Sequence, residues 1–217
     1  MRSWPAFPGE IYAGVVDKIA QASTSGQSTS FSFSIKERAV MLAGSRNRQL
    51  PPALCKALVQ QLHFLGLGFL VGCANGVDRA FRKVLCAEPY CHRTFVACAF
   101  HARTKPYYTF GLEANVVVPP HLSPRAALHR RTVWMVRTCQ MLIVFPVDPK
   151  TGNWGRGSSL ALTTACHNFR PVFIAAKTPP PKNPLYIVLP GELFGLITGY
   201  WAIPHPVSEG GYCHDDI

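Results

Sequence analysis

The sequence predicts an α/β fold in which a mainly parallel, doubly wound sheet carries helices on both faces. Short continuous apolar runs of strand length alternate along the chain with segments of helical length. This alternation is typical of parallel sheets that are buried on both faces. Small, flexible residues follow several of the runs, as expected at strand-to-helix turns. The 217 residues are 48% hydrophobic and 15% charged, which is enough apolar surface for one ordinary domain with a core.

The first half of the pattern predicts three strands and two helices. Strands are expected at 38–43, 68–72 and 94–100, because each is a short apolar run bounded by turn residues. Helices are expected at 52–65 and 77–86. The first of them opens on proline, whose missing N–H would have no partner in the first turn of a helix.

The second half continues the same alternation. A short strand is expected at 115–118 and a helix at 124–138, followed by a strand at 140–145. After a glycine-rich loop, a helix at 158–168 and a strand at 171–175 complete the pattern.

Composition divides the chain into three segments. Residues 1–35 are expected to hold a short amphipathic helix and then a polar linker at 21–34, which buries little surface. Residues 36–178 form the α/β domain. Residues 179–217 begin with three prolines and contain an apolar stretch at 185–203, expected to be a hairpin or an added strand. The side chains of this apolar stretch either complete the core, which we favour, or form an interface between two copies of the chain. A homo-oligomer is therefore one of the two alternatives.

Positive charge is concentrated in the predicted α/β domain. The net charge is +11, and residues 38–177 hold 18 of the 22 Lys and Arg but only four of the 11 Asp and Glu. A field of this sign attracts nucleotides and nucleic-acid backbones. The longest apolar stretch, 64–74, is too short to span a bilayer, and no apolar run follows a basic N-terminus. We therefore expect a cytoplasmic protein without a membrane partner.

The eight cysteines lie mostly in apolar segments, which is typical of buried free thiols in a cytosolic protein. Cys86, Cys91 and His92 come closest to a metal site, but no second pair of ligands matches them, so no metal is expected. Cys73 lies in a strand-to-helix turn with no histidine near it in sequence. We expect no catalytic residue there, because a nucleophilic thiol needs a base beside it.

Three predicted strand-to-helix turns carry the candidate binding residues. In a parallel sheet these turns share the carboxyl edge, where N–H groups at helix starts are free to bind an anion. Glycine also suits a tight turn without any ligand, but three such turns in this order favour a phosphate site. The candidates are Gly44, Ser45 and Arg46 in the first turn, Gly72, Ala74, Asn75, Gly76 and Asp78 in the second, and Gly155, Arg156, Gly157, Ser158 and Ser159 in the third.

Several of these side chains fit two roles. Ser45 and Arg46 hold a phosphate or lie in a solvated turn. Asp78 accepts from a ribose hydroxyl or, as we favour, stabilises the positive end of its helix. Arg130 and Arg131 precede an apolar helix face, so one is expected to point into the cleft and the other into water.

The third turn and two aromatic segments complete the predicted site. Arg156 lies between two glycines and is the basic residue we most expect to contact a phosphate. Ser158 and Ser159 either cap the following helix or bind the phosphate. Tyr107 and Tyr108, next to basic residues, and Trp154 are candidates for stacking on a base, although an ordinary loop is the favoured alternative for the tyrosines.

Four motifs in a fixed order carry a resemblance to a known family. They are AGSR at 43–46, VGCANGVDRAF at 71–81, HRRTVWMV with CQMLIVFP at 129–146, and GRGSSLALTTACHNFRPVFI at 155–174. This order resembles the SLOG superfamily of Rossmann-like nucleotide-binding proteins, and within it the DNA-processing protein A (Smf) branch and the YspA-like branch. The resemblance covers about residues 38–176. It implies a Rossmann-like fold with a nucleotide or single-stranded DNA as ligand.

The chain departs from these branches at positions that bear on function. Val71-Gly72 stands where the DNA-processing branch has Ser-Gly, and Arg130-Arg131-Thr132 stands where it has Arg-Asn-Arg. The related LONELY GUY phosphoribohydrolases place a glutamate after a glycine-rich loop, whereas no Asp or Glu occurs here from 149 to 191. Glycosidic cleavage typically uses a carboxylate. A hydrolase would therefore have to use Asp78 or Glu113 instead.

These observations predict a protein that binds a nucleotide or nucleotide-derived ligand, without catalysis and without a further cofactor. The first alternative is a single-stranded DNA-binding protein of the DNA-processing type, which would bind with a steep dependence on salt. The second is an enzyme resembling the nucleoside monophosphate phosphoribohydrolases.

Overall fold

The computed structural model describes residues 39–148 and 151–204, and in them eight strands form one sheet. The amphipathic helix and the linker predicted before residue 36 lie outside this range. The strand order is β4-β3-β2-β1-β5-β6-β8-β7. The strands are β1 (Ala39–Gly44), β2 (Gly68–Gly72), β3 (Thr94–Cys98), β4 (Glu113–Val116), β5 (Met141–Phe145), β6 (Val172–Ile174), β7 (Tyr186–Leu193) and β8 (Ile197–Pro204).

Strands β1 to β6 are parallel, and the chain winds outward from β1 in both directions. From β1 it proceeds through β2 and β3 to β4, and then returns to place β5 on the other side of β1. Gly44 and Phe145, the last residues of β1 and β5, are paired in register. The two loops that leave these strands therefore start side by side and diverge, which is where parallel α/β sheets open a crevice for ligands.

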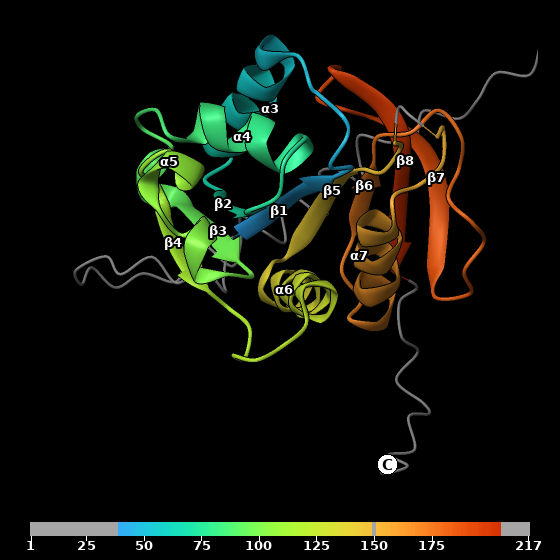
Figure 1. Cartoon of the computed structure of the whole chain (residues 1–217). Coiled ribbons are helices and arrows are strands. Elements are labelled where there is room, and N and C mark those ends of the chain that lie inside the picture. The colour runs from blue at the N-terminus through green and yellow to red at the C-terminus, as the bar shows by residue number, and fades with distance from the viewer. Residues whose placement is uncertain (1–38, 149–150, 205–217) are drawn as a thin grey trace, which may run out of the picture.

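Helices cover both faces of the sheet (Figure 1). Buried residues of α3 and α4 pack on one face, and buried residues of α6 and α7 pack on the other. The helical elements are α3 (Pro52–Phe64), α4 (Val77–Leu85), η1 (Cys91–Arg93), η2 (His101–Arg103), α5 (Pro106–Thr109), α6 (Pro124–Thr138) and α7 (Arg156–His167). This is the predicted α/β class, a Rossmann-like, mainly parallel sheet between two helical layers. None of the described helices has the length and apolar content needed to cross a membrane.

Local sequence explains where the helices begin. In α6, Ser123 precedes Pro124 and its Oγ accepts a hydrogen bond from the Ala126 N–H at 3.4 Å, which is the usual role of serine before a helix. Helix α7 begins at Arg156 and not near 158 as predicted, so Arg156 and Gly157 belong to its first turn. The short helix α5 was not predicted.

Strands β7 and β8 form an antiparallel hairpin, and β8 pairs with β6 to extend the sheet. Leu193 is buried, and Ile197 and Trp201 pack against the core. The Trp201 ring lies 5.1 Å from that of Phe173, edge to face. These side chains complete the core at the edge of the sheet.

Candidate functional site

A pocket of about 880 Å³ opens where the loops after β1 and β5 diverge, with α6 as its third wall. Its volume lies in the range of small-molecule sites, about 300–1,000 Å³. Most of the predicted residues are brought together here. Those that line the pocket are Gly44, Ser45, Arg46, Ala74, Asp78, Arg131, Trp154, Gly155, Arg156, Gly157 and Ser158.

Ser45 joins the three loops through its backbone. Its N–H donates to the Phe145 carbonyl at 3.0 Å, and its carbonyl accepts from the Val77 N–H at 3.2 Å. Its Oγ accepts from the Asn47 N–H at 3.2 Å. The Ser45 side chain is buried, whereas Arg46 next to it is exposed at the pocket. Ser45 thus fixes the loop after β1, and Arg46 is free to contact a ligand.

Gly76 brings the second loop against the first without lining the pocket. Its φ is +67°, and a Cβ there would lie 2.5 Å from the carbonyl carbon of Arg46. Only glycine combines this backbone angle with such a close approach. Gly76 and its neighbour Asn75 shape the loop, and neither is among the residues that line the pocket.

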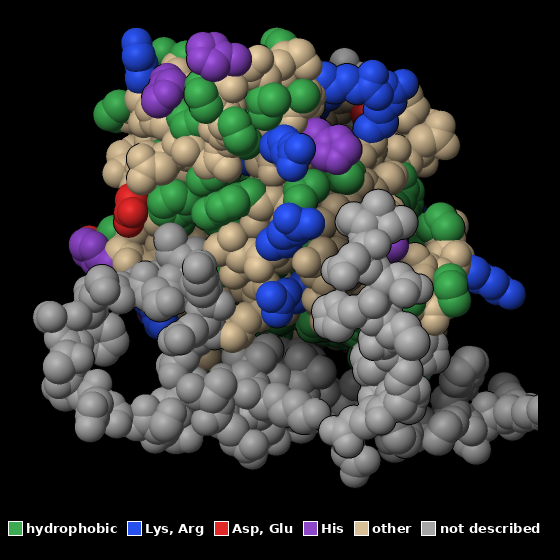
Figure 2. Space-filling model, turned by 90° about the horizontal axis from the view of Figure 1, so that it is seen from below, with side chains coloured by type: hydrophobic (Ala, Val, Ile, Leu, Met, Phe, Trp, Pro, Cys, Tyr) green, Lys and Arg blue, Asp and Glu red, His purple; other side chains and the backbone are tan. Residues whose placement is uncertain are grey.

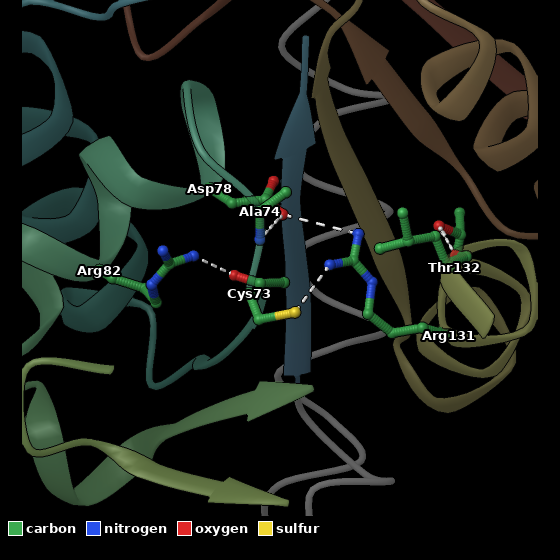
Figure 3. A network of polar contacts seen from close by, with 8 residues as sticks. Cys73, Ala74, Asp78, Arg82, Arg131 and Thr132 are labelled. Carbon is green, nitrogen blue, oxygen red and sulfur yellow. Dashed lines mark hydrogen bonds and ion pairs between the residues drawn. The ribbon is translucent and has the colours of Figure 1, made fainter. Parts of the chain in front are cut away.

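Asp78 lies in the first turn of α4, and its carboxylate is held there in a buried ion pair. Its Oδ2 lies 3.7 Å from Nη2 of Arg131 and accepts from the Ala74 N–H at 3.3 Å (Figure 3). Burial raises the pKa of the Asp78 carboxyl above its ordinary value, and the charges of Arg131 and Arg82 oppose that rise. Asp78 has the first-turn position that its favoured role, stabilising the helix start, requires, and the contact with Arg131 is a further one that the sequence did not indicate.

Gly72 lies beneath this ion pair and makes room for it. A Cβ at residue 72 would lie 2.9 Å from Cζ of Arg131 and would collide with the Asp78 carboxylate. Gly72 does not line the pocket, so its part in the site is steric.

The N-terminus of α7 faces the pocket without a side-chain cap. The first N–H groups of a helix have no partner within it, and they carry the positive end of the helix dipole. Ser158, in the same turn, is only 3% exposed, and its Oγ has no hydrogen-bond partner. A second buried polar atom that lines the pocket without a partner is Nε of Arg131. Buried polar groups are nearly always satisfied, so both atoms are candidates to contact a ligand in the pocket.

Basic side chains outnumber acidic ones around the pocket. Arg46, Arg125, Arg131 and Arg156 line it, while the lining carboxylates among the described residues are Asp78 and Asp148. Asp148 accepts from Nδ2 of Asn47 at 2.6 Å. On the face of the molecule seen in Figure 2, Lys, Arg and His side chains are visible in several places and acidic ones are rare.

Trp154 is the predicted aromatic residue that reaches the pocket. It is half-buried and pairs with Val147 in an isolated antiparallel bridge. This bridge fixes the Trp154 backbone close in sequence to the α7 N-terminus, and the side chain packs in part against the core.

Tyr107 and Tyr108, for which base stacking was the less favoured of two predicted roles, do not line the pocket. They belong to α5, after β3, which is two strands away from the crevice beside β1. Tyr107 is exposed, its ring lies 4.4 Å from that of Tyr108, and the guanidinium of Arg103 lies 4.7 Å from the Tyr108 ring. The cluster is therefore a surface feature of its own.

Two further predicted side chains also lie off the pocket. Arg130 is exposed and does not line it, so Arg131 is the arginine of this pair that points inward. Ser159 is exposed, and its Oγ donates to the Gly155 carbonyl at 3.4 Å.

One face of α6 lines the pocket and was missed in the sequence. Its residues are Arg125, Leu128, His129, Thr132 and Met135. They recur every three or four positions, which is the spacing of one helix face. That spacing, together with the inward Arg131, is the signal that could have found them.

A separate cluster could hold a metal ion in the described part of the chain. One ligand atom from each of Glu88, Cys91 and His92 lies within 4.8 Å of the others. None of the three lines the pocket, and Cys86 instead donates its thiol hydrogen to the Lys83 carbonyl at 3.3 Å. Nε2 of His92 and Oε1 of Glu88 are 2.8 Å apart on an exposed surface.

Comparison with known proteins gives matches among solved structures alone. No protein-family model and no curated protein matches the sequence. DNA processing protein A from Helicobacter pylori, which binds single-stranded DNA, is similar at 16% identity and a TM-score of 0.47, over 67% of this chain and 69% of that one. DNA processing protein A from Streptococcus pneumoniae is similar at 18% identity and a TM-score of 0.49, over 65% of this chain and half of that one. Likenesses this distant carry no information about what the pocket binds.

Proposed function

We propose that this chain binds a nucleotide or a nucleotide-derived ligand, with its phosphate at the N-terminus of α7, and catalyses no reaction there. The observation that carries the proposal is Ser158 Oγ, buried at the uncapped start of α7 without a partner. A phosphate oxygen satisfies this hydroxyl and the free N–H groups of the same turn together.

The rest of the pocket suits the other parts of a nucleotide. Arg46 and Arg156 are exposed on opposite sides of the crevice, after β1 and at the start of α7, where each can pair with a phosphate. The Trp154 indole offers a surface for a base. A volume of about 880 Å³ accommodates a whole nucleotide.

The carboxylates favour binding over glycosidic cleavage. Asp78 is buried against Arg131, so its charge serves the ion pair and is not free to assist a water molecule. Glu113 lies on β4, the outer strand beside β3, and does not line the pocket. We include membership of the SLOG superfamily in this proposal, and the order of the loop motifs supports it. A cytoplasmic location is also part of the proposal.

Single-stranded DNA is the second candidate ligand, and one observation favours it. Three exposed arginines, Arg46, Arg125 and Arg156, line the pocket. Such a set can also hold successive phosphates of a polymer.

The experiment compares two adjacent serines and two kinds of ligand. Binding of a labelled oligonucleotide is followed by fluorescence anisotropy across a salt series, with mono- and dinucleotides as competitors. Ser158→Ala is expected to weaken nucleotide binding about tenfold or more, because a hydrogen bond to a charged group is lost. Ser159→Ala, an exposed neighbour, is the matched control and leaves binding unchanged.

The outcomes separate the two candidates. Weak oligonucleotide binding that one nucleotide displaces supports a small ligand. Tight, steeply salt-dependent oligonucleotide binding that nucleotides do not displace supports single-stranded DNA. Nucleotide binding that survives Arg46→Ala combined with Arg156→Ala contradicts a phosphate site in this pocket.

A further inference from the structure

Two cysteines lie side by side under the pocket. Gly72, the last residue of β2, pairs with Ala97 of β3, so the next position in register places Cys73 opposite Cys98. Neighbouring strands are about 4.8 Å apart, and disulfides join Cα atoms about 4.4–6.8 Å apart. Both side chains are buried in the same core cluster. This placement is compatible with a bond between the two sulfurs.

The two thiols differ in what they contact. Sγ of Cys73 accepts a hydrogen bond from Nη1 of Arg131 at 3.4 Å (Figure 3). The Cys98 thiol lies beside both the Arg103 carbonyl, with Sγ and O 3.4 Å apart, and the Cys73 sulfur, and its single hydrogen can be donated to either of them. Cys73 is thus set up to carry a negative charge, and Cys98 to carry the proton.

The electrostatics of the site agree with this division. A hydrogen bond from Cys98 and the charge of Arg131 lower the pKa of Cys73, against the opposing effect of burial. The same hydrogen bond raises the pKa of Cys98, and burial adds to the rise. Burial raises the pKa of Cys55 to about 11 and that of Cys139 to about 12. Cys73 is therefore distinguished from other buried thiols by its partners.

We propose that Cys73 and Cys98 are a redox-active pair that a small hydroperoxide converts into a reversible disulfide. Cys73 is the attacking thiol and Cys98 the resolving thiol. Ala74, which follows Cys73, and Arg131, which contacts its sulfur, both line the open pocket. A small oxidant that enters the pocket therefore comes close to the attacking thiol. The inference is independent of which ligand the pocket binds.

The reaction proceeds in two balanced steps with hydrogen peroxide as the oxidant. The Cys73 thiolate attacks one peroxide oxygen, an S–O bond forms, the O–O bond breaks, and hydroxide leaves and takes a proton from solvent. Sulfur of Cys98 then attacks the Cys73 sulfenic acid. The S–S bond forms, the S–O bond breaks, and the Cys98 proton leaves with the oxygen as water. Both sulfurs are oxidised, and the peroxide is reduced to two molecules of water.

The test treats the reduced full chain with one equivalent of hydrogen peroxide. Free thiols are then alkylated under denaturing conditions, and the peptides are identified by mass spectrometry. We expect a peptide that joins Cys73 to Cys98, the loss of two free thiols, and full recovery with dithiothreitol. Oxidation confined to the exposed Cys86, or disulfides between other cysteines with Cys73 left free, overturns the proposal.

Variants separate the two roles and provide a control. In Cys98→Ser, oxidation stops at the Cys73 sulfenic acid, which dimedone traps. In Cys73→Ser, Cys98 stays reduced, because its thiol has no attacking role. Cys166→Ala removes a buried thiol on α7 and leaves formation of the Cys73 to Cys98 disulfide unchanged. If Cys98→Ser gives no dimedone adduct at Cys73 while the wild type forms the disulfide, the assigned order of attack is wrong.

Discussion

The Arg131 guanidinium lies 3.7 Å from the Asp78 carboxylate, and this contact links helix α6 to the start of helix α4 across the carboxyl edge of the sheet. The arginine side chain is 10% exposed and the aspartate 6%. Both charges are buried, and Arg131 compensates the Asp78 carboxylate together with the buried Arg82. The same guanidinium reaches the sulfur of Cys73, so one residue connects the pocket, the ion pair and the thiol pair.

Arg131→Gln is expected to lower the free energy of unfolding by about 3 kcal/mol, since removal of its closest positive partner leaves the buried Asp78 charge with only Arg82 to compensate it. The measurement is urea denaturation at neutral pH. Arg130→Gln is the matched control, because Arg130 is the exposed neighbour on the same helix, and its loss should change the free energy by no more than about 0.5 kcal/mol. Equal effects of the two substitutions contradict a structural role for the pair.

Gly72→Ala is expected to destabilise the protein by about 1–3 kcal/mol, because the added methyl group overlaps Arg131 and the Asp78 carboxylate. Thermal unfolding measures the loss. Gly157→Ala is the control, since nothing lies within 4 Å of a Cβ there and alanine suits a helix better than glycine. An unchanged melting temperature in Gly72→Ala shows that the ion pair has room to move.

The sequence predicted the sheet and its helices well, because each buried strand is a short apolar run with small residues after it. The β-strand at 68–72 and the helix at 124–138 have the predicted bounds. The start of α7 was placed about two residues too late, because Gly155 and Gly157 suggested a loop. In the structure, Gly157 lies in the first turn of the helix, and its backbone adopts helical angles there.

The site was harder to predict than the fold. The three turns do converge, because parallel strands share one carboxyl edge. Whether Tyr107 reaches them, the less favoured of its two predicted roles, depends on which strand lies next to which. Strand order is a long-range property that local sequence does not contain. The pairing of Asp78 with Arg131 was not predicted for the same reason, because it joins residues 53 positions apart in the sequence. The register that places Cys73 beside Cys98 also follows from strand neighbours.

Alkylation of Cys73 is expected to depend on pH unlike that of an ordinary thiol. The thiolate is the reactive form, and the Cys98 thiol and the Arg131 charge lower the pKa of Cys73 below that of an ordinary thiol. The rate with iodoacetamide should therefore level off at a pH below the pKa of a free thiol, about 8.5. In Arg131→Gln the curve moves to higher pH, because the positive charge beside the sulfur is lost. A rate that still rises through about pH 9 in the wild type shows an ordinary thiol.

Trp154→Leu is expected to separate base recognition from phosphate recognition. Stacking is worth about 1–3 kcal/mol per base, so affinity for a nucleotide should fall at least about fivefold, while affinity for inorganic pyrophosphate stays the same. Isothermal titration calorimetry measures both ligands. Tyr107→Leu is the control, because Tyr107 is exposed away from the pocket. A parallel loss of pyrophosphate binding would mean that Trp154 holds the loop and not the base.

Ser158→Ala is expected to preserve or raise stability while it weakens binding. The buried Ser158 hydroxyl has no hydrogen-bond partner within the protein, so its removal relieves an unsatisfied group, and the free energy of unfolding without ligand should rise by up to about 1–3 kcal/mol. Residues kept for a ligand often cost stability in this way. Urea denaturation with and without the best nucleotide from the panel measures both effects. With nucleotide present, the wild type should gain more stability than the variant, because a ligand stabilises the folded state more when it binds that state more tightly. A loss of stability without ligand would show that the hydroxyl serves the fold.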